Sequence, residues 1–143
     1  AEEHVLIAAQ ALGNALASYD RVLAYIKGRE QFGRKIATFQ VSKHKIADMA
    51  TRIELSRLML HKAAIEIDRG KPNAATCAMA KCTACEAAMH AGAQAIQLFG
   101  GYGYMTEYEV ERFYRDAKSM EVREGGQEVQ NDIISNEFIG KIK

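Results

Sequence analysis

The sequence predicts an all-α protein, an up-down four-helix bundle with a short extra helix. Three observations support this fold class: apolar residues recur at gaps of three and four over most of the 143 residues, the chain holds one proline, and no segment of useful length alternates polar and apolar residues. Proline is the strongest helix breaker, so a single proline permits long helices. Long helices joined by short connections pack antiparallel.

The first predicted helix runs from Glu2 to about Lys27. Its apolar stripe consists of Leu12, Leu16, Tyr19, Leu23 and Ile26. This spacing is typical of one face of an amphipathic helix. The segment 28–37, GREQFGRKIA, then interrupts the pattern with two glycines and several basic residues, which indicates a structured loop.

Two further long helices are predicted from about Phe39 to Arg69 and from about Pro72 to Phe99. The apolar stripe of the first is Ile46, Met49, Ile53, Leu60, Ala64 and Ile67. Gly70 can adopt the left-handed conformation that ends a helix, and Pro72 suits the first turn of the next one. The second is rich in alanine, and small residues allow close approach of neighbouring helices. We therefore expect it to be the central helix.

The last part of the chain predicts two shorter helices. Thr106 and Glu109 have the spacing of a capping box, which predicts a helix that ends near Ala117. Residues 118–126 are predicted to be a loop, and residues 127–142 a last helix. The apolar stripe of this last helix is Val129, Ile133 and Phe138.

The composition is that of one globular domain in a reducing compartment. Hydrophobic residues make up 48%, and 19 Lys and Arg against 18 Asp and Glu give a net charge of +1. This balance excludes disorder and argues against nucleic acid as the main partner, and no run of residues is apolar enough to span a membrane. Three cysteines between Cys77 and Cys85 do not make a disulfide framework, and we interpret Cys82-x-x-Cys85 as core residues rather than a zinc or redox motif. The chain starts without Met and without a cap, so we expect it to be part of a longer protein that is not secreted.

Three segments could carry chemistry. Arg29-x-x-Phe32-Gly33 combines a guanidinium with a glycine turn, which suits a phosphate or pyrophosphate. Segment 97–103, QLFGGYG, lets the backbone approach a ligand closely. Glu124 lies on a glycine-rich turn, and a carboxylate shielded from water there could act as a general base. Each segment also has a purely structural alternative. The Arg29 segment could be a solvated loop, segment 97–103 could be a helix end followed by a turn, and Glu124 could be a solvated carboxylate.

Together these segments resemble the C-terminal helical domain of the acyl-CoA dehydrogenases. The resemblance covers nearly the whole chain, and it rests on the joint order of several motifs rather than on any one of them. The motifs are Arg29-x-x-Phe32-Gly33 with Gln40 beyond it, Ala47-Asp48-Met49, Gln97-x-Phe99-Gly100-Gly101-x-Gly103-Tyr104, Arg115-Asp116-Ala117-Lys118 and Glu124-Gly125.

The resemblance implies a cofactor and an assembly. Family members have a helical N-terminal domain, a middle β-domain and a C-terminal bundle like residues 1–143, in a homotetramer arranged as a dimer of dimers. FAD lies between the middle domain and the C-terminal bundles of two subunits. By motif position, Arg29, Phe32 and Gln40 are expected to contact the pyrophosphate and adenosine part of a neighbouring subunit's FAD. The residues expected to line the same FAD are Gln97, Gly100 and Gly101.

The resemblance also implies an activity, the α,β-dehydrogenation of an acyl-CoA thioester. A Glu removes the α-proton while hydride passes from the β-carbon to flavin N5. Glu124 stands at the position of the base in most members, whereas Glu3 stands where members acting on branched or long-chain substrates carry theirs; we favour Glu124. The expected electron acceptor is electron-transfer flavoprotein, and the expected location is the bacterial cytoplasm or the mitochondrial matrix.

Two alternatives stay open. The same fold could serve an acyl-CoA oxidase or an enoyl-CoA reductase, and a non-catalytic helical module could retain only the assembly contacts. We expect the 143 residues alone to be inactive and not to hold FAD tightly, because most of that site would lie on other domains.

Overall fold

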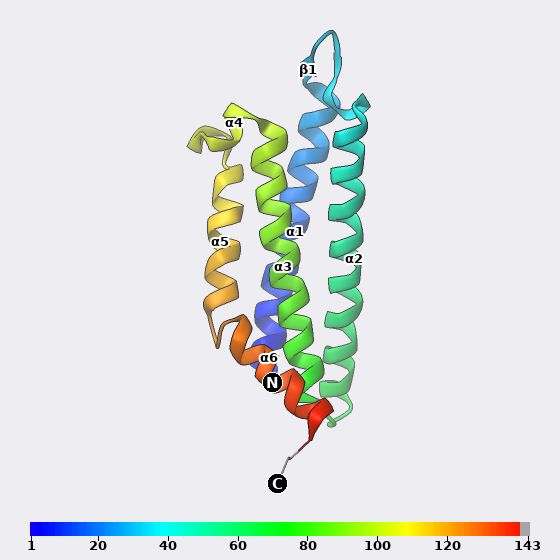
Figure 1. Cartoon of the computed structure of the whole chain (residues 1–143), viewed down its shortest axis with the longest axis vertical. Coiled ribbons are helices and arrows are strands. Elements are labelled where there is room, and N and C mark those ends of the chain that lie inside the picture. The colour runs from blue at the N-terminus through cyan, green and yellow to red at the C-terminus, as the bar shows by residue number, and fades with distance from the viewer. Residues whose placement is uncertain (141–143) are drawn as a thin grey trace.

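The computed structural model describes residues 1–140, which form an all-α bundle (Figure 1). Their six α-helices are α1 (Glu2–Gly28), α2 (Gln40–Asp68), α3 (Ala74–Phe99), α4 (Gly101–Tyr104), α5 (Val110–Val122) and α6 (Gln127–Ile139). Helices α1, α2, α3 and α5 run along the long axis, and α6 lies across the lower end of α3. The predicted fold class is confirmed. Within the described residues, no helix is both long and apolar enough to cross a membrane.

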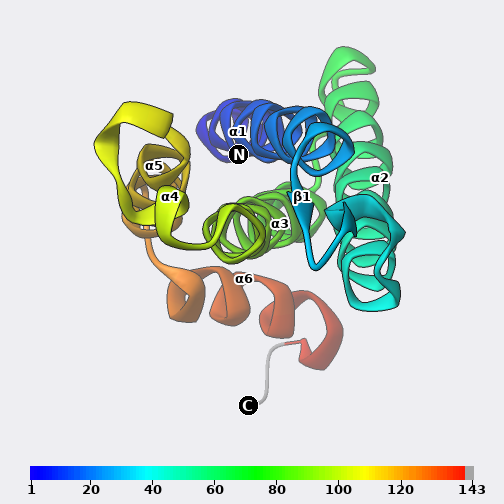
Figure 2. The same ribbon diagram turned by 90° about the horizontal axis from the view of Figure 1, so that it is seen from above.

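Helix α3 is the centre of the bundle, as predicted. Seen from above, it is surrounded by α1, α2, α5 and α6 (Figure 2). Its buried positions are mostly alanine and cysteine, which lets the neighbouring backbones come close. One close approach is at Gly92, where an added Cβ would lie 2.9 Å from the Cα of Tyr114 on α5.

The predicted apolar faces of α2 and α1 are both only partly right. On α2, Met49, Ile53 and Leu60 are buried, whereas Ile46, Ala64 and Ile67 are only partly buried. On α1, Leu12 and Ile26 are buried as predicted, Leu16, Tyr19 and Leu23 are only partly buried, and half of the buried side chains are small. The reason is that α1 packs on the alanine-rich α3, so its small residues make the closest contact and the larger ones flank it. The small buried residues of α1 are Ala8, Ala11, Ala15 and Ser18.

The junction of α2 and α3 differs in one detail from the prediction. Gly70 has φ +69 and ends α2 as expected. Helix α3, however, begins at Ala74 rather than at Pro72, because the Asn73 side chain caps it by accepting a hydrogen bond of 2.8 Å from the Thr76 N–H. The side-chain oxygen of an N-cap Asn accepts from a backbone N–H of the first turn, and proline has no side-chain acceptor that could do this.

The predicted capping box at Thr106 and Glu109 does not form, and the predicted end of the following helix is wrong. Thr106 opens a 3₁₀ turn (Thr106–Tyr108), and Glu109 takes the left-handed conformation, φ +60, as the residue before α5. Helix α5 then continues to Val122 instead of ending near Ala117. Met120 is buried on the same face as Ala117, so the extra turn adds to the core.

Helix α6 does not pack with its predicted stripe. Val129 and Phe138 are exposed, Phe138 to 74%, and the buried residue of α6 is Gln130. Two of the three predicted stripe residues therefore face away from this bundle, whereas the third, Ile133, is half-buried. The helix is described to Ile139, and its predicted end at Ile142 lies outside the described residues.

The connection 28–37 is structured, as predicted, and contains a small hairpin that the sequence pattern did not reveal. Strands β1 (Glu30–Gln31) and β2 (Arg34–Lys35) pair antiparallel, followed by a 3₁₀ turn (Ile36–Thr38). Phe32 and Gly33 form the hairpin turn with φ values of +54 and +76, the left-handed pair that tight two-residue hairpins require. Two-residue strands are too short to show an alternating pattern.

His90 is expected to make the stability of the bundle depend on pH. Its Nε2 lies 2.7 Å from Oδ2 of Asp48, which Arg52 Nε also contacts at 3.1 Å. Burial lowers the pKa of His90, and the charge of Arg52 acts in the same direction against Asp48. As pH falls, the unfolded chain therefore takes up this proton first, so the free energy of unfolding is expected to fall between about pH 7 and pH 5. Denaturant titrations over this range should show that the free energy of unfolding depends less on pH in His90→Asn than in the exposed control variant His61→Asn. An equal pH dependence in the two variants would contradict the assignment.

Candidate functional site

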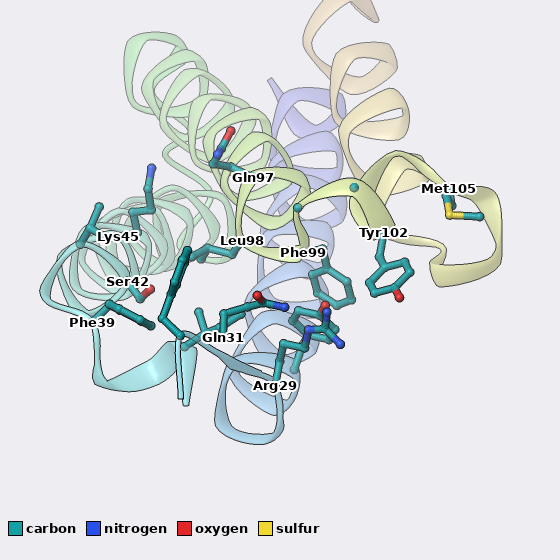
Figure 3. A pocket seen from close by; sticks show the side chains of 16 residues that line it. Arg29, Gln31, Phe39, Ser42, Lys45, Gln97, Leu98, Phe99, Tyr102 and Met105 are labelled. Carbon is teal, nitrogen blue, oxygen red and sulfur yellow. The ribbon is translucent and has the colours of Figure 1, made fainter. Parts of the chain in front are cut away.

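A cavity of about 720 Å³ opens at the end of the bundle that carries the hairpin and α4 (Figure 3). Its walls are the end of α1, the hairpin, the first turns of α2 and the turn after α3. The cavity brings together predicted site residues that are up to 72 positions apart in the chain. They are Arg29, Phe32, Gln97, Gly100 and Gly101.

Aromatic rings surround the one guanidinium that lines this cavity. The ring of Tyr25 stacks on that of Phe99 with 3.9 Å between centroids, and Arg29 Cζ lies 5.4 Å from the ring centroid of Tyr102. Figure 3 shows Arg29 beside Phe99 and Tyr102. Burial raises the pKa of Tyr25, although Arg29 opposes it, so this phenol stays neutral near pH 7. The cavity therefore combines flat apolar surfaces with a fixed positive charge.

The charges of the hairpin are arranged differently from a simple basic cluster. Lys35 Nζ contacts Oε1 of Glu30 at 2.8 Å, and this hydrogen bond lowers the pKa of Glu30. Arg34 Cζ lies 3.9 Å from the ring centroid of Phe39. Arg29 has no carboxylate within ion-pair distance among residues 1–140. Of the three basic residues in segment 28–37, Arg29 is thus the one placed to meet an anion in the cavity.

Gln40 is the one predicted cofactor residue that does not line the cavity. It is exposed at the first position of α2, while its neighbours Phe39 and Val41 both contribute to the wall. Gln97 lies on the cavity rim away from Arg29 (Figure 3).

Eleven of the sixteen lining residues were not predicted as cofactor residues, among them Tyr25, Ser42, Lys45 and Tyr102. Helical spacing carries a signal for one of these four. Tyr25 lies one turn before Arg29, and residues one turn apart share a helix face, so Tyr25 could have been added once Arg29 was assigned to the site. Ser42 and Lys45 lie one turn from each other at the start of α2, but no predicted site residue lies one turn from either of them.

Glu124 lies at the other end of the bundle, on the turn 123–126 between α5 and α6. From Lys81, which contacts this turn, to Gln97 at the cavity, α3 rises about 24 Å. The Glu124 side chain is exposed, and its backbone is left-handed with φ +53. The cavity and this turn therefore occupy opposite ends of one central helix.

The second candidate carboxylate, Glu3, is at the same end as Glu124. The next residue, His4, is half-buried against the turn. Burial lowers the pKa of His4, as do the charges of the N-terminus and Lys81, while a hydrogen bond to the backbone of Glu124 acts in the opposite direction. The start of α1 and the 123–126 turn are thus adjacent.

Arg123, which precedes Glu124, belongs to a second cavity of about 320 Å³ between α1 and α5. Asp116, Gln10 and Asn14 line the same cavity. The Arg123 guanidinium therefore lines the same polar cavity as the Asp116 carboxylate.

The cysteines are core residues, as interpreted from the sequence. Cys77, Cys82 and Cys85 are buried and unpaired. Burial raises the pKa of the Cys85 thiol to about 11, so it stays protonated near pH 7, unlike a reactive or metal-bound cysteine.

The comparisons with known proteins agree with this architecture. Residues 1–139 match the family model "Acyl-CoA dehydrogenase, C-terminal domain". The chain is 48% identical to the probable acyl-CoA dehydrogenase YngJ of Bacillus subtilis, over 94% of this chain and 36% of that protein. It is 40% identical to a 3-(aryl)acrylate reductase of Clostridium sporogenes, over 93% of this chain and 35% of that protein. The structure of butyryl-CoA dehydrogenase from Megasphaera elsdenii matches with a TM-score of 0.93 and 41% identity, over 95% of this chain and 36% of that chain. The chain thus spans about a third of the length of these relatives.

Proposed function

Because the chain belongs to the acyl-CoA dehydrogenase family and matches its C-terminal domain, we propose that it is part of an FAD-dependent enzyme that dehydrogenates the α,β bond of an acyl-CoA thioester. The observation that carries the proposal is the cavity around Arg29, which gathers five of the six expected cofactor residues. When bound, FAD would supply the hydride acceptor at flavin N5. Electron-transfer flavoprotein is the proposed electron acceptor and a homotetramer the proposed assembly.

We place the pyrophosphate and adenosine part of FAD in this cavity. The Arg29 guanidinium offers paired N–H donors that suit phosphate oxygens. An added Cβ at Gly100 or Gly101 would meet nothing within 4 Å, so a ligand can approach the backbone there. Phe32 is 93% exposed and offers a flat ring to the adenine. Gln40 would reach the cofactor from the rim.

Glu124 is the proposed base that removes the α-proton, with Glu3 as the second candidate. The α-proton of a thioester is a weak acid, so the base must be held against the substrate and shielded from water. Glu124 is exposed in this chain, and the shielding must therefore come from the middle domain, the substrate or another subunit. For this reason we propose that the 143 residues alone are inactive.

The separation of cavity and turn supports a site shared between subunits. About 24 Å of α3 lies between them. We propose that the cavity of each bundle holds the FAD of a neighbouring subunit, while the 123–126 turn of the same bundle serves its own substrate.

A second candidate function is the reverse reaction, reduction of an enoyl-CoA. The 40% identity to a 3-(aryl)acrylate reductase favours it as the alternative. The same Glu124 would then return a proton to the α-carbon, since a base in one direction is the acid in the other. Oxidised flavin in the full-length protein should be bleached anaerobically by acyl-CoAs if the enzyme is a dehydrogenase. Reoxidation of the reduced flavin by enoyl-CoAs, with no bleaching by any acyl-CoA, would instead identify a reductase. Turnover that consumes oxygen would identify an oxidase.

Arg29→Gln in the full-length protein is expected to raise the Kd for FAD about 10- to 100-fold, because hydrogen bonds to a charged group contribute about 1.5–3 kcal/mol. Equilibrium dialysis against FAD measures the change. Arg69→Gln, at the far end of α2, is the matched control and should bind as the unaltered protein does. Equal affinities for the two variants would remove Arg29 from the cofactor site.

A further inference from the structure

Lys81 is a buried lysine that the proposed mechanism does not use. It is 1% exposed and lies about two turns from the start of α3. Lysine is almost never fully buried unless its charge is paired, because desolvation of an ammonium is costly. The partners of Lys81 therefore indicate what the buried charge is for.

Both hydrogen-bond partners of Lys81 lie on the turn that carries Glu124. The Nζ donates to the carbonyl oxygens of Arg123 and Gly125, the residues on either side of Glu124. Within residues 1–140, Lys81 has no carboxylate at ion-pair distance. The buried charge is thus directed at the backbone of the turn and leaves the Glu124 carboxylate unpaired.

Gln130 completes the fixation of the same turn. It is 1% exposed, and its Nε2 donates to the carbonyl oxygens of Glu124 at 3.2 Å and Gly125 at 3.1 Å. Lys81 and Gln130 together therefore bind the carbonyls of three consecutive residues, Arg123 to Gly125. This turn needs support because Glu124, which is not a glycine, is left-handed at φ +53, and such a conformation persists only where the surroundings impose it.

We propose that Lys81 is a positioning residue that, with Gln130, fixes the 123–126 turn so that the Glu124 carboxylate projects toward the substrate. The inference rests on the proposed function, in which Glu124 is the base. It assigns to a buried lysine a role in the rate of proton abstraction and none in FAD binding, because the cavity lies at the other end of α3. A misplacement of a reacting group by about 1 Å can cost about 100-fold in rate.

The test uses the full-length protein with FAD, as Lys81→Met and, as the matched control, Lys62→Met at an exposed position of α2. Methionine keeps the length of the side chain and removes its charge and donors. We expect Lys81→Met to slow flavin reduction by a reactive acyl-CoA about 10- to 100-fold per bound flavin. FAD affinity and the acyl-CoA concentration for half-maximal rate should change less than about threefold, and Lys62→Met should behave as the unaltered protein does.

Amide hydrogen exchange supplies a readout that does not need turnover. Peptides that span residues 120–130 should exchange faster in Lys81→Met than in Lys62→Met, while peptides from the cavity end should not. If Lys81→Met fails to fold, Gln130→Met tests the same turn by removing its other two hydrogen bonds. A reduction rate per flavin equal to that of the control, or unchanged exchange of the turn, would overturn the proposal. If no acyl-CoA or enoyl-CoA reacts even with the unaltered protein, the proposed function fails, and the exchange comparison still decides whether Lys81 fixes the turn.

Discussion

Replacing Glu124 by glutamine in the full-length protein is expected to slow reduction of the bound flavin by an acyl-CoA about 10²- to 10⁴-fold, the usual contribution of a positioned general base. Glutamine keeps the size of the side chain but cannot take up the α-proton. The residue lies on the exposed face of the 123–126 turn, and its main-chain carbonyl, which Gln130 binds, is unchanged by the substitution. Folding and FAD binding should therefore be retained. Stopped-flow measurement of flavin reduction under anaerobic conditions gives the rate.

Glu3→Gln is the matched comparison, because the start of α1 lies next to the same turn. We expect it to reduce the rate less than about tenfold, since a neighbouring charge that does not take the proton acts only through weak electrostatics. The reverse pattern, full activity of Glu124→Gln and loss in Glu3→Gln, would transfer the base to α1.

Gly92→Ala is expected to destabilise the bundle by about 1–3 kcal/mol, the usual cost of overpacking a close contact. The new methyl group would lie 2.9 Å from the Cα and 3.0 Å from the backbone N of Tyr114. Backbone atoms cannot rotate away as a side-chain end can, so α5 must shift away from α3. Thermal and denaturant unfolding of the chain measure the loss.

The control for this prediction is Gly13→Ala on α1, with the opposite expected sign. A Cβ on Gly13 meets nothing within 4 Å, and alanine in a helix is favoured over glycine by about 0.5–1 kcal/mol. Gly13→Ala should therefore raise the unfolding free energy while Gly92→Ala lowers it. Equal effects of the two substitutions would show that α3 and α5 are not in close contact at Gly92.

The helices of the bundle could be predicted from the sequence wherever local signals and the core agree. Gly70 predicted the end of α2 correctly, because a left-handed glycine ends a helix through its own backbone. The end of α5 was missed because Met120 is the one apolar contact in a polar run, and only the packing against the bundle selects it. The capping box at Thr106 failed for a similar reason, since the left-handed backbone of Glu109 depends on the turn in which it lies.

The candidate site shows the same division between local and long-range information. Its residues Arg29 and Gly100 stand out locally because a charge or a glycine marks a turn. Lys81 could not be found in this way, because a lysine among alanines and cysteines is indistinguishable by composition from a solvent-facing residue. Its proposed role follows only from the folded structure, in which Lys81 Nζ donates to carbonyl oxygens of the turn 123–126, more than forty positions later in the sequence.

We propose that one bundle serves two flavins, with Arg29 at one end and Glu124 at the other. The most direct test mixes two full-length variants, Arg29→Gln and Glu124→Gln, and allows their subunits to exchange in the presence of FAD. Each variant alone should be defective, the first in FAD binding and the second in flavin reduction by acyl-CoA. If the cavity of one subunit completes the site of its neighbour, mixed assemblies contain sites with both residues intact, and acyl-CoA-dependent flavin reduction should reappear. If the mixture stays as inactive as the separate variants although the subunits have exchanged, Arg29 and Glu124 of the same chain act on the same flavin, and the shared site is contradicted.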